Sequence, residues 1–330
     1  MTTLVTGATG FVGSAVVRRL LDAGHDVRVL ARPASRRDNL EGLSVDIVEG
    51  DLRDAESLVA AVKGCDTLFH VAADYRLWVR RPDDLYEANV SGSLNLFRAA
   101  ADAGVERMVY TSSVATLGLN ADGTSSTETT PVDGDEIIGH YKRSKYLAEQ
   151  QVRTMAKREH LPVVTVNPST PIGPRDLKPT PTGRVIVQAA RGRLPAFVDT
   201  GLNVVHVDDV ADGHLLALER GEVGERYILG GENWTLQQVL TEIAKLTGRR
   251  APSIKLSQSM MMPLVYLSEA FAWALHGKRA PMLTVDGLRM SQHKMFFSSD
   301  KAISNLGYSP RNAEEAVHDA VVWFREHRYC

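Results

Sequence analysis

Cysteine is scarce in this sequence. The 330 residues include two cysteines, Cys65 and Cys330, which lie far apart, and the second is the last residue. This spacing argues against a disulfide framework and against a metal site built from thiolates, and we expect no metal. Such a chain fits the reducing cytoplasm. The N-terminus runs directly into the first predicted strand, which leaves no room for a signal peptide.

Blocks of like charge and long hydrophobic runs are also missing. The 38 basic and 40 acidic side chains give a net charge of -2, so nothing indicates binding to nucleic acid or to an anionic membrane. No apolar run reaches the ~20 residues of a membrane span, and no internal repeat or low-complexity tract is visible. These absences leave small-molecule chemistry as the default function.

What is present is a glycine turn at the start of the chain. A short aliphatic run, Leu4 to Thr6, predicts a buried strand, and the spacing from Phe11 to Ala23 predicts a helix. The first turn of a helix leaves backbone N–H groups unpaired, and the helix dipole makes this end attractive for a pyrophosphate. We expect a dinucleotide there rather than a plain glycine-rich turn. The residues assigned to it are Gly7, Thr9, Gly10, Phe11, Val12 and Gly13.

The ends of the next two strands bear on the choice of cofactor. The strand Asp26 to Ala31 is followed by Arg32, and an arginine at this point can pair with a 2′-phosphate where an acidic residue would bind a ribose hydroxyl. This favours NADP(H) over NAD(H), which is still an alternative if Arg32 belongs to a solvated basic loop. After the third strand, Val45 to Glu49, we expect Asp51 and Leu52 to meet the adenine.

Further candidate cofactor contacts follow the fourth strand, Thr67 to Val71. Its composition predicts burial on both faces, and the small residues Ala72 and Ala73 allow the close approach of a cofactor. His70 is more plausible as a packed side chain than as a catalytic acid, because no paired acid lies nearby. A long helix from Asp83 or Asp84 to Ala103 then carries Asn89.

The catalytic candidates come from the fifth strand and the helix after it. The strand Arg107 to Thr111 presents Ser113 at its carboxyl end, where ligands bind in open parallel sheets. Tyr141 and Lys145 are four apart on one helix and therefore share a face. The lysine ammonium, with an oxidised nicotinamide nearby, is expected to lower the phenol pKa from its usual value of about 10, so that Tyr141 acts as an acid and base. Ser113 would hold the substrate oxygen by a hydrogen bond.

The order of these elements predicts a doubly wound parallel α/β sheet. The sixth strand, Val163 to Asn167, leads to Pro168 and Ser169, which we assign to the cofactor site. We expect a Rossmann domain over residues 1–170. Residues 171–330 are expected to form mainly a smaller substrate-binding lobe, interleaved with returning strands of the main sheet. The loop from Asn120 to Asp135 is too polar to be core.

Taken together, the glycine turn, Asn89, Ser113, Tyr141 and Lys145 resemble the extended branch of the short-chain dehydrogenase/reductase superfamily. This resemblance implies that Ser113, Tyr141 and Lys145 are the catalytic triad, that Asn89 contributes to the cofactor site, and that the protein is a homodimer. The intact triad argues against a catalytically idle scaffold.

Two subfamilies of that branch compete. Nucleotide-sugar epimerases and dehydratases commonly carry an arginine that binds the substrate diphosphate, and Leu202 stands at the matching position here. This departure favours the dihydroflavonol 4-reductase-like group, which reduces ketones or aldehydes with NADPH. The segments around Ala73, Tyr141 and Pro171 are similar to the hopanoid-associated member of the branch, which implies a role in bacterial hopanoid biosynthesis. An epimerase that oxidises its substrate transiently, with no net redox change, is the alternative.

Candidate substrate contacts are Tyr75 and Trp78, which follow the fourth strand, and Arg175. The most apolar stretch runs from Met260 to Leu267 and continues to Trp273. It predicts either a Met-rich pocket wall for a lipid-linked substrate or a buried or dimer-forming helix, the commoner outcome.

Overall fold

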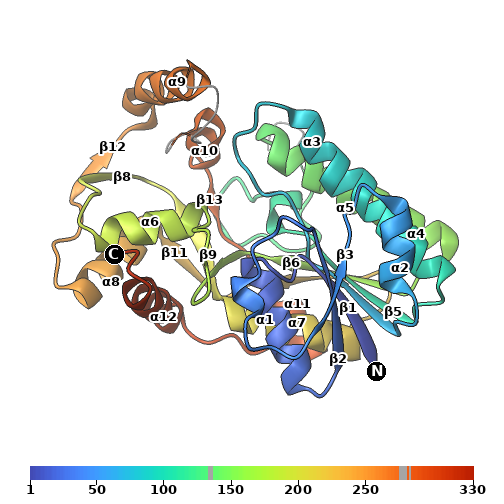
Figure 1. The fold of residues 1–330 in the computed structure, drawn as a ribbon. Helices are drawn as coiled ribbons and strands as arrows, with labels where there is room; N and C mark the ends of the chain where they lie inside the picture. Colours follow the sequence, from blue (N-terminus) through green and yellow to red (C-terminus); the bar gives the residue numbers. More distant parts are fainter. Residues whose placement is uncertain (133–136, 275–280, 282–283) are drawn as a thin grey trace.

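A seven-stranded parallel sheet organises the computed structural model, which describes residues 1–132, 137–274, 281 and 284–330 (Figure 1). The strand order is β10-β6-β5-β4-β1-β2-β3, and every neighbouring pair is parallel. This order confirms the predicted doubly wound sheet. The strands are β1 (Thr2–Thr6), β2 (Asp26–Ala31), β3 (Asp46–Glu49), β4 (Thr67–His70), β5 (Arg107–Thr111), β6 (Val163–Pro168) and β10 (Arg226–Leu229).

Helices cover both faces of this sheet (Figure 1). Successive strand residues face opposite sides: Leu68 belongs to the hydrophobic cluster on one face and Phe69 to that on the other, and both are fully buried. This confirms the predicted two-sided burial of β4. The helices of the first face are α2 (Ala55–Val62), α4 (Gly92–Asp102) and α5 (Gly139–Glu159), and those of the second are α1 (Phe11–Asp22), α7 (Val207–Arg220) and α11 (Asp300–Leu306).

The long helix predicted to end at Ala103 is interrupted. It consists of α3 (Pro82–Tyr86), a π-helical turn η2 (Glu87–Ser91) and α4. A π turn adds a residue to the helical repeat and often lies at a functional site. Here it contains Asn89, whose side chain points toward the loop after β4, as described below.

The elements beyond residue 170 form smaller sheets and a second helical layer, while β10 returns to the main sheet. β9 pairs in parallel with β7 and β13 and antiparallel with β11, and β8 pairs with β12. These strands are β7 (Thr170–Ile172), β8 (Ala196–Val198), β9 (Gly201–His206), β11 (Glu232–Thr235), β12 (Ile254–Leu256) and β13 (Lys294–Met295). The helices are α6 (Pro181–Ala190), α8 (Leu236–Thr247), α9 (Gln258–Ala274), α10 (Val285–Met290) and α12 (Ala313–Glu326). Among the described helices, none has the length and apolarity needed to traverse a bilayer.

The loop after residue 120 corrects one expectation from the sequence. Ser126 is fully buried and Glu128 is 6% exposed, so the polar composition did not keep this segment outside the core. The reason is hydrogen bonding at the sheet edge: Glu128 Oε1 accepts from the backbone N–H of Ile228 in the edge strand β10, at 2.8 Å. The expected Asp133 to Asp135 part of the loop lies outside the described residues.

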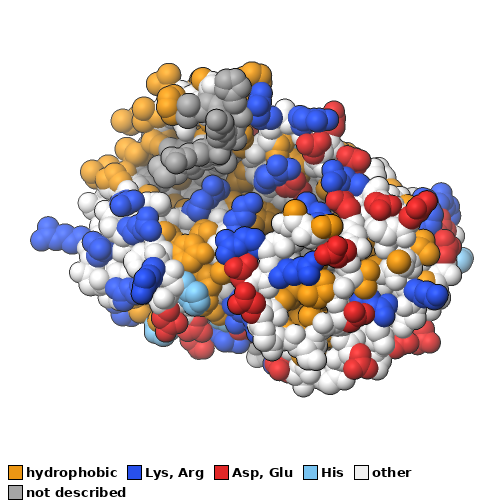
Figure 2. Space-filling model, viewed as in Figure 1, with side chains coloured by type: hydrophobic (Ala, Val, Ile, Leu, Met, Phe, Trp, Pro, Cys, Tyr) orange, Lys and Arg blue, Asp and Glu red, His pale blue; other side chains and the backbone are white. Residues whose placement is uncertain are grey.

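Helix α9 corrects a second expectation. Its apolar side chains are mostly exposed, including Met260, Leu264 and Phe271, and they gather over α9 at the top left of Figure 2. Only Val265 and Ala272 are buried, so the prediction of a buried helix is wrong. The hypothesis of a pocket wall stays a prediction, since Arg80, in the loop after β4, lies 5.4 Å from the centre of the Trp273 ring at the end of α9. The dimer-forming alternative stays a prediction.

Candidate functional site

The glycine turn leaves no room for side chains. Gly7 has φ +71°, and a Cβ on it would lie 2.6 Å from the backbone nitrogen of Ala72. A Cβ on Gly13 would lie 2.1 Å from the carbonyl oxygen of Gly7. Gly10 caps α1 without a side chain, and the first turn of α1 contains no acidic residue. A Cβ at any of the three glycines would fill this cradle, and the exposed N–H groups fit a pyrophosphate.

The basic residues after β2 differ in their partners. Arg36 pairs with Asp38, and Arg37 pairs with Glu49. The exposed guanidinium of Arg32 forms no hydrogen bond or ion pair with the described part of the chain. Arg32 is therefore available to an anionic ligand at the carboxyl end of β2.

Asp51, at the predicted adenine position, already has a partner. Its carboxylate accepts from Arg53 Nε at 3.0 Å and from Arg53 Nη2 at 2.8 Å. These bonds lower the pKa of Asp51 to about 2, and the charge of Arg32 acts in the same direction. Leu52 packs where Gly92 of α4 approaches it, since a Cβ on Gly92 would lie 2.8 Å from Leu52 Cβ.

The loop after β4 is held by Asn89. The Asn89 Oδ1 accepts from Asp74 N at 2.7 Å, while Nδ2 donates to Asp74 O and to Ser144 Oγ, both at 2.9 Å. Asn89 is 3% exposed. Asn89 therefore ties the backbone of Asp74 to Ser144 of α5, and its contribution to the cofactor site stays a prediction.

His70 is a packed side chain, as expected. It is fully buried between Thr6 Oγ1 at 2.7 Å and Ser93 Oγ at 2.8 Å. Burial lowers the pKa of His70 to about 3, with the charge of Lys145 adding to the effect. His70 is therefore neutral at physiological pH.

The structure brings Ser113, Tyr141 and Lys145 together at the carboxyl end of β5. Ser113 begins the turn η3 (Val114–Thr116), and its hydroxyl is near enough to the phenol of Tyr141, the third residue of α5, to affect the pKa of that phenol. Lys145 Nζ donates to Thr111 O at 3.0 Å and lies 5.2 Å from the centre of the Tyr110 ring. The three side chains therefore lie at the same end of β5, with Tyr141 and Lys145 on one face of α5.

The charges of Tyr141 and Lys145 depend mainly on burial. Burial raises the pKa of Tyr141, and the neighbouring hydroxyl of Ser113 opposes this rise only in part. Burial also lowers the pKa of Lys145 to about 8, against the opposing charge of Glu149. The protein's own groups therefore keep Tyr141 protonated near neutral pH. The expected lowering of the phenol pKa also depends on the charge of the oxidised nicotinamide and stays a prediction for the loaded site.

Sequence reasoning missed Glu149. It lies eight residues after Tyr141 and four after Lys145, so all three share one face of α5. The signal was the run Tyr-x-x-x-Lys-x-x-x-Glu on a helix whose first two members were already assigned. Glu149 is fully buried and bonded to Ser112, directly after β5, and to residues of β6 and β10.

The end of β6 offers a further fit for a cofactor. Pro168 is the last residue of this strand, and Ser169 N donates to Leu229 O at 3.1 Å. The Ser169 hydroxyl is buried and has no hydrogen-bond partner among the described residues. An unsatisfied buried hydroxyl at the ligand edge of a parallel sheet suits a contact with the bound dinucleotide.

The candidate substrate residues separate into two places. The phenol of Tyr75 is near enough to Tyr141 to raise its pKa, and Asp176 in turn raises the pKa of Tyr75. Asp176 is itself 3% exposed, and burial raises its pKa to about 6. Trp78 is half-buried in the same loop as Tyr75.

Arg175 does not join this group. Its guanidinium pairs with Asp208 at the start of α7, and the other charge acting on it is that of Arg18 in α1. Its carbonyl oxygen accepts from Asn39 Nδ2, which also contacts Thr9 O, each at 3.3 Å. Arg175 therefore lies beside the glycine turn, and the structure gives no support to a substrate contact there.

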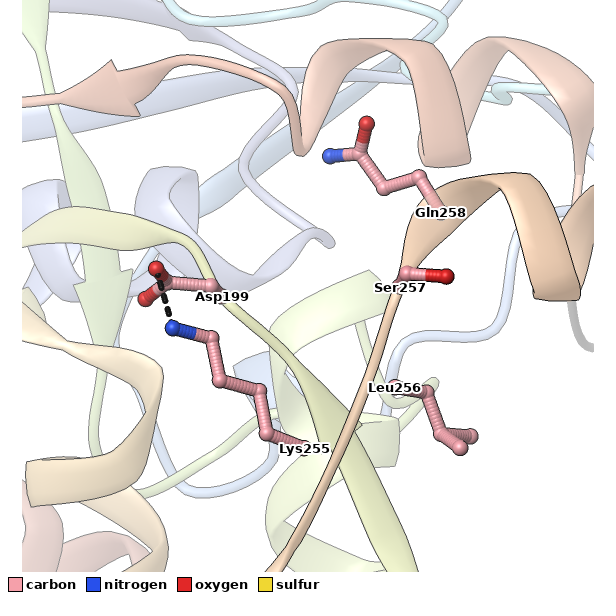
Figure 3. Close-up of a pocket in the computed structure, with 5 residues that line it drawn as sticks. All are labelled: Asp199, Lys255, Leu256, Ser257 and Gln258. Carbon is pink, nitrogen blue, oxygen red and sulfur yellow. Dashed lines mark hydrogen bonds and ion pairs between the residues drawn. The ribbon is translucent and has the colours of Figure 1, made fainter.

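A surface cavity of about 350 Å³ lies apart from these residues (Figure 3). It is lined by Asp199, Lys255, Leu256, Ser257 and Gln258, at the start of α9. Lys255 Nζ donates to Asp199 Oδ2 at 2.6 Å, so its two charged groups neutralise each other. None of the catalytic candidates lines it.

The similarity of this chain to known proteins shows its family. The sequence model of the NAD dependent epimerase/dehydratase family matches residues 3–230, a span that contains the glycine turn and the whole triad. The chain belongs to this family. The epimerase/dehydratase family forms part of the extended short-chain dehydrogenase/reductase group, so the predicted resemblance is confirmed.

Relatives of this epimerase/dehydratase family member span nearly its whole length. A protein of Synechocystis sp., provisionally named dihydroflavonol 4-reductase, is 46% identical over 98% of this chain and 95% of its own length. The crystal structure of gox2253 shares 54% identity with a TM-score of 0.88 and covers 99% of this chain and 98% of its own. DesIV, a dTDP-glucose 4,6-dehydratase of Streptomyces venezuelae crystallised with NAD, shares 26% identity with a TM-score of 0.79, covering 99% and 98%. The family and its neighbours are enzymes that use NAD.

Proposed function

We propose that this epimerase/dehydratase family member is an NADP(H)-dependent reductase of the dihydroflavonol 4-reductase-like type. It transfers hydride between NADP(H) and a carbonyl or hydroxyl of a polyol-, sugar- or lipid-linked substrate. The observation that carries the proposal is the approach of the Ser113 hydroxyl to the Tyr141 phenol, with Lys145 one helical turn behind, at the ligand edge of the sheet.

The residues of the chain have distinct roles in this reaction. When bound, the nicotinamide cofactor supplies or takes up the hydride. Tyr141, protonated near neutral pH, donates its phenolic proton to the substrate oxygen during reduction, and Ser113 hydrogen-bonds the same oxygen. Lys145 stabilises the phenolate that is left. For oxidation of an alcohol the proton moves in the opposite direction.

The cofactor would be held along the carboxyl edge of the sheet. The glycine turn and the first N–H groups of α1 would bind the pyrophosphate. Ala72, Ala73, Pro168 and Ser169 would lie along the nicotinamide half, and Asp51 and Leu52 beside the adenine. The uncommitted guanidinium of Arg32 supports NADP(H) over NAD(H), because a 2′-phosphate would give it a charge-assisted partner.

Replacing Arg32 with aspartate tests the cofactor assignment. We expect NADPH binding to weaken about 100-fold, since a charge-assisted contact is lost and a repulsive charge is added. NADH binding should change less than about threefold. Calorimetric titration of both nucleotides measures the two effects on the same purified protein.

The matched control is Arg36→Asp, which makes the same change of charge at a side chain already paired with Asp38. Its NADPH affinity should fall far less than that of Arg32→Asp. An equal fall in both variants would indicate a diffuse basic field and contradict a specific contact at Arg32.

The second candidate is an NAD-dependent epimerase, which causes no net redox change. It is favoured by the family and by the NAD bound in DesIV. Against a nucleotide-sugar substrate stands Leu202, half-buried in β9 where those enzymes commonly carry a diphosphate-binding arginine. A reductase consumes free NADPH in the presence of ketones or aldehydes. Purified protein that retains NAD⁺ and oxidises no NADPH would favour the epimerase instead.

The proposal also includes a setting and an assembly. We propose a cytoplasmic homodimer, formed through α4 and α5, with a role in bacterial hopanoid biosynthesis. The support is the sequence resemblance around Ala73, Tyr141 and Pro171, together with two free cysteines. Light scattering on the purified chain tests the dimer.

A further inference from the structure

Glu149 is a buried carboxylate with a complete set of donors. Its side chain is fully buried. Oε2 accepts from Ser112 Oγ at 2.5 Å, Thr116 Oγ1 at 2.7 Å and Asn167 Nδ2 at 2.9 Å, and Oε1 accepts from Arg226 Nη1 at 2.8 Å. A buried carboxylate is tolerated only when such bonds replace its hydration.

The same donors form the frame around Ser113. Thr116 Oγ1 lies 2.7 Å from Ser113 O as well as from Glu149, so its proton is shared between the two acceptors. Asn167 Nδ2 reaches Ser113 O at 3.0 Å. A single side chain on α5 therefore fixes the turn after β5 and the end of β6, which together orient Ser113.

Glu149 also lies one helical turn from Lys145, within a small group of charges. Lys145 faces Tyr141 and Glu149 from α5, the Tyr110 ring from β5, and His70 from β4. Of these, Glu149 is the one whose charge favours the ammonium form of Lys145. Two arginines act on it in turn, Arg226 from β10 at 2.8 Å and Arg153 from α5 at 3.9 Å.

We propose that Glu149 is the positioning residue of this catalytic site. Its carboxylate aligns the Ser113 turn with Tyr141, and its ion pair with Arg226 sets the net charge that faces Lys145. This inference rests on the proposed function in its assignment of Ser113, Tyr141 and Lys145 to the reaction.

Neutralising Glu149 and neutralising Arg226 should shift the pH at which Lys145 loses its proton in opposite directions. Lys145 loses its proton as the pH rises through about 8. Removing the negative charge of Glu149 makes the ammonium less stable, so Lys145 deprotonates at lower pH. Removing the positive charge of Arg226 leaves the carboxylate less compensated, so Lys145 deprotonates at higher pH. At an effective dielectric constant of about 20, the shift from removing the charge of Glu149 is about one pH unit.

The experiment titrates Lys145 directly. Protein labelled with ¹⁵N-lysine gives a side-chain resonance for Lys145, assigned by its loss in Lys145→Met. We expect the titration midpoint to fall in Glu149→Gln and to rise in Arg226→Gln, which keeps a donor for the carboxylate. No shift in either variant, or shifts of the same sign in both, would overturn the proposal, because a loosened fold has no reason to move Lys145 in opposite directions.

Thr116→Val tests the orientation of Ser113 separately from the charge that acts on Lys145. It removes a hydroxyl from the Ser113 frame and no charge, so kcat should fall about 10-fold or more while the Lys145 midpoint stays in place. If Glu149→Gln fails to fold, Arg226→Gln and Thr116→Val carry the same test. A Thr116→Val enzyme with unchanged kcat would refute the alignment role.

Failure of the proposed function gives a different result. The reductase is refuted if wild-type protein binds NADPH but does not oxidise it when ketones or aldehydes are added. The Lys145 titrations need no substrate, so they still decide whether Glu149 and Arg226 set its charge.

Discussion

Tyr141→Phe is expected to lower kcat about 10³-fold while NADPH binding changes less than about threefold. The substitution removes the phenolic proton that the substrate oxygen receives, and a positioned general acid contributes about 10² to 10⁴ in rate. The ring, its place on α5 and the backbone are retained. Steady-state NADPH oxidation and calorimetric titration of NADPH measure the two quantities separately.

Tyr146→Phe is the matched control for this substitution. Tyr146 lies on the same helix, directly after Lys145, and is also half-buried, but it points away from the face that carries Tyr141 and Lys145. Its kcat should stay within about twofold of the wild type. Wild-type turnover by Tyr141→Phe would remove Tyr141 from the acid-base role, and the substrate oxygen would then need another proton donor.

The pH dependence of the reaction follows from the same group. The pKa of Tyr141 is raised, so its phenol stays protonated as the pH increases from neutral. Lys145, with a pKa of about 8, is the first of the pair to change its charge. The alkaline loss of reduction therefore reports Lys145, and this is why the residues that surround Lys145, above all Glu149, matter for the rate.

The parts of the site that sequence could predict are those with a local pattern. Gly7, Gly10 and Gly13 stand between a strand and a helix, and Tyr141 and Lys145 are one helical turn apart. Both patterns follow from the geometry of a single element. The burial of β4 on both faces could also be predicted, because its pattern lies within four consecutive residues of one strand.

The rest depends on contacts between distant segments. Glu149 receives donors from the turn after β5, from β6 and from β10, up to 77 positions away in the sequence, so only the folded sheet gathers them. The polar loop around Glu128 is buried because it completes the edge of β10, and composition gives no sign of that. Arg175 has φ +76° and turns toward Asp208, a conformation that no sequence pattern indicated.

Gly13→Ala is expected to disable the nucleotide site and to destabilise the fold. The new methyl group would lie 2.1 Å from the oxygen and 2.6 Å from the carbon of the Gly7 carbonyl, both backbone atoms that cannot rotate away. The helix α1 must therefore move off the turn, which costs about 2–3 kcal/mol of the free energy of unfolding. NADPH binding should weaken at least about 100-fold, because the N–H groups at the start of α1 no longer converge on one phosphate. Urea unfolding without nucleotide and calorimetric titration with NADPH measure the two losses.

Gly10→Ala provides a graded comparison on the same turn. Its Cβ would approach the Gly7 oxygen only to 3.2 Å, a contact that a shift of a few tenths of an ångström relieves. The loss of stability should therefore be smaller than at Gly13, while NADPH binding still weakens because the added methyl group stands where the phosphate approaches the backbone. Gly10→Ala should thus weaken NADPH binding with only a small loss of stability, whereas Gly13→Ala should lower both. If Gly13→Ala lost stability but bound NADPH as the wild type does, the N-terminus of α1 would not be the pyrophosphate site, and the cofactor would have to bind along another part of the sheet edge.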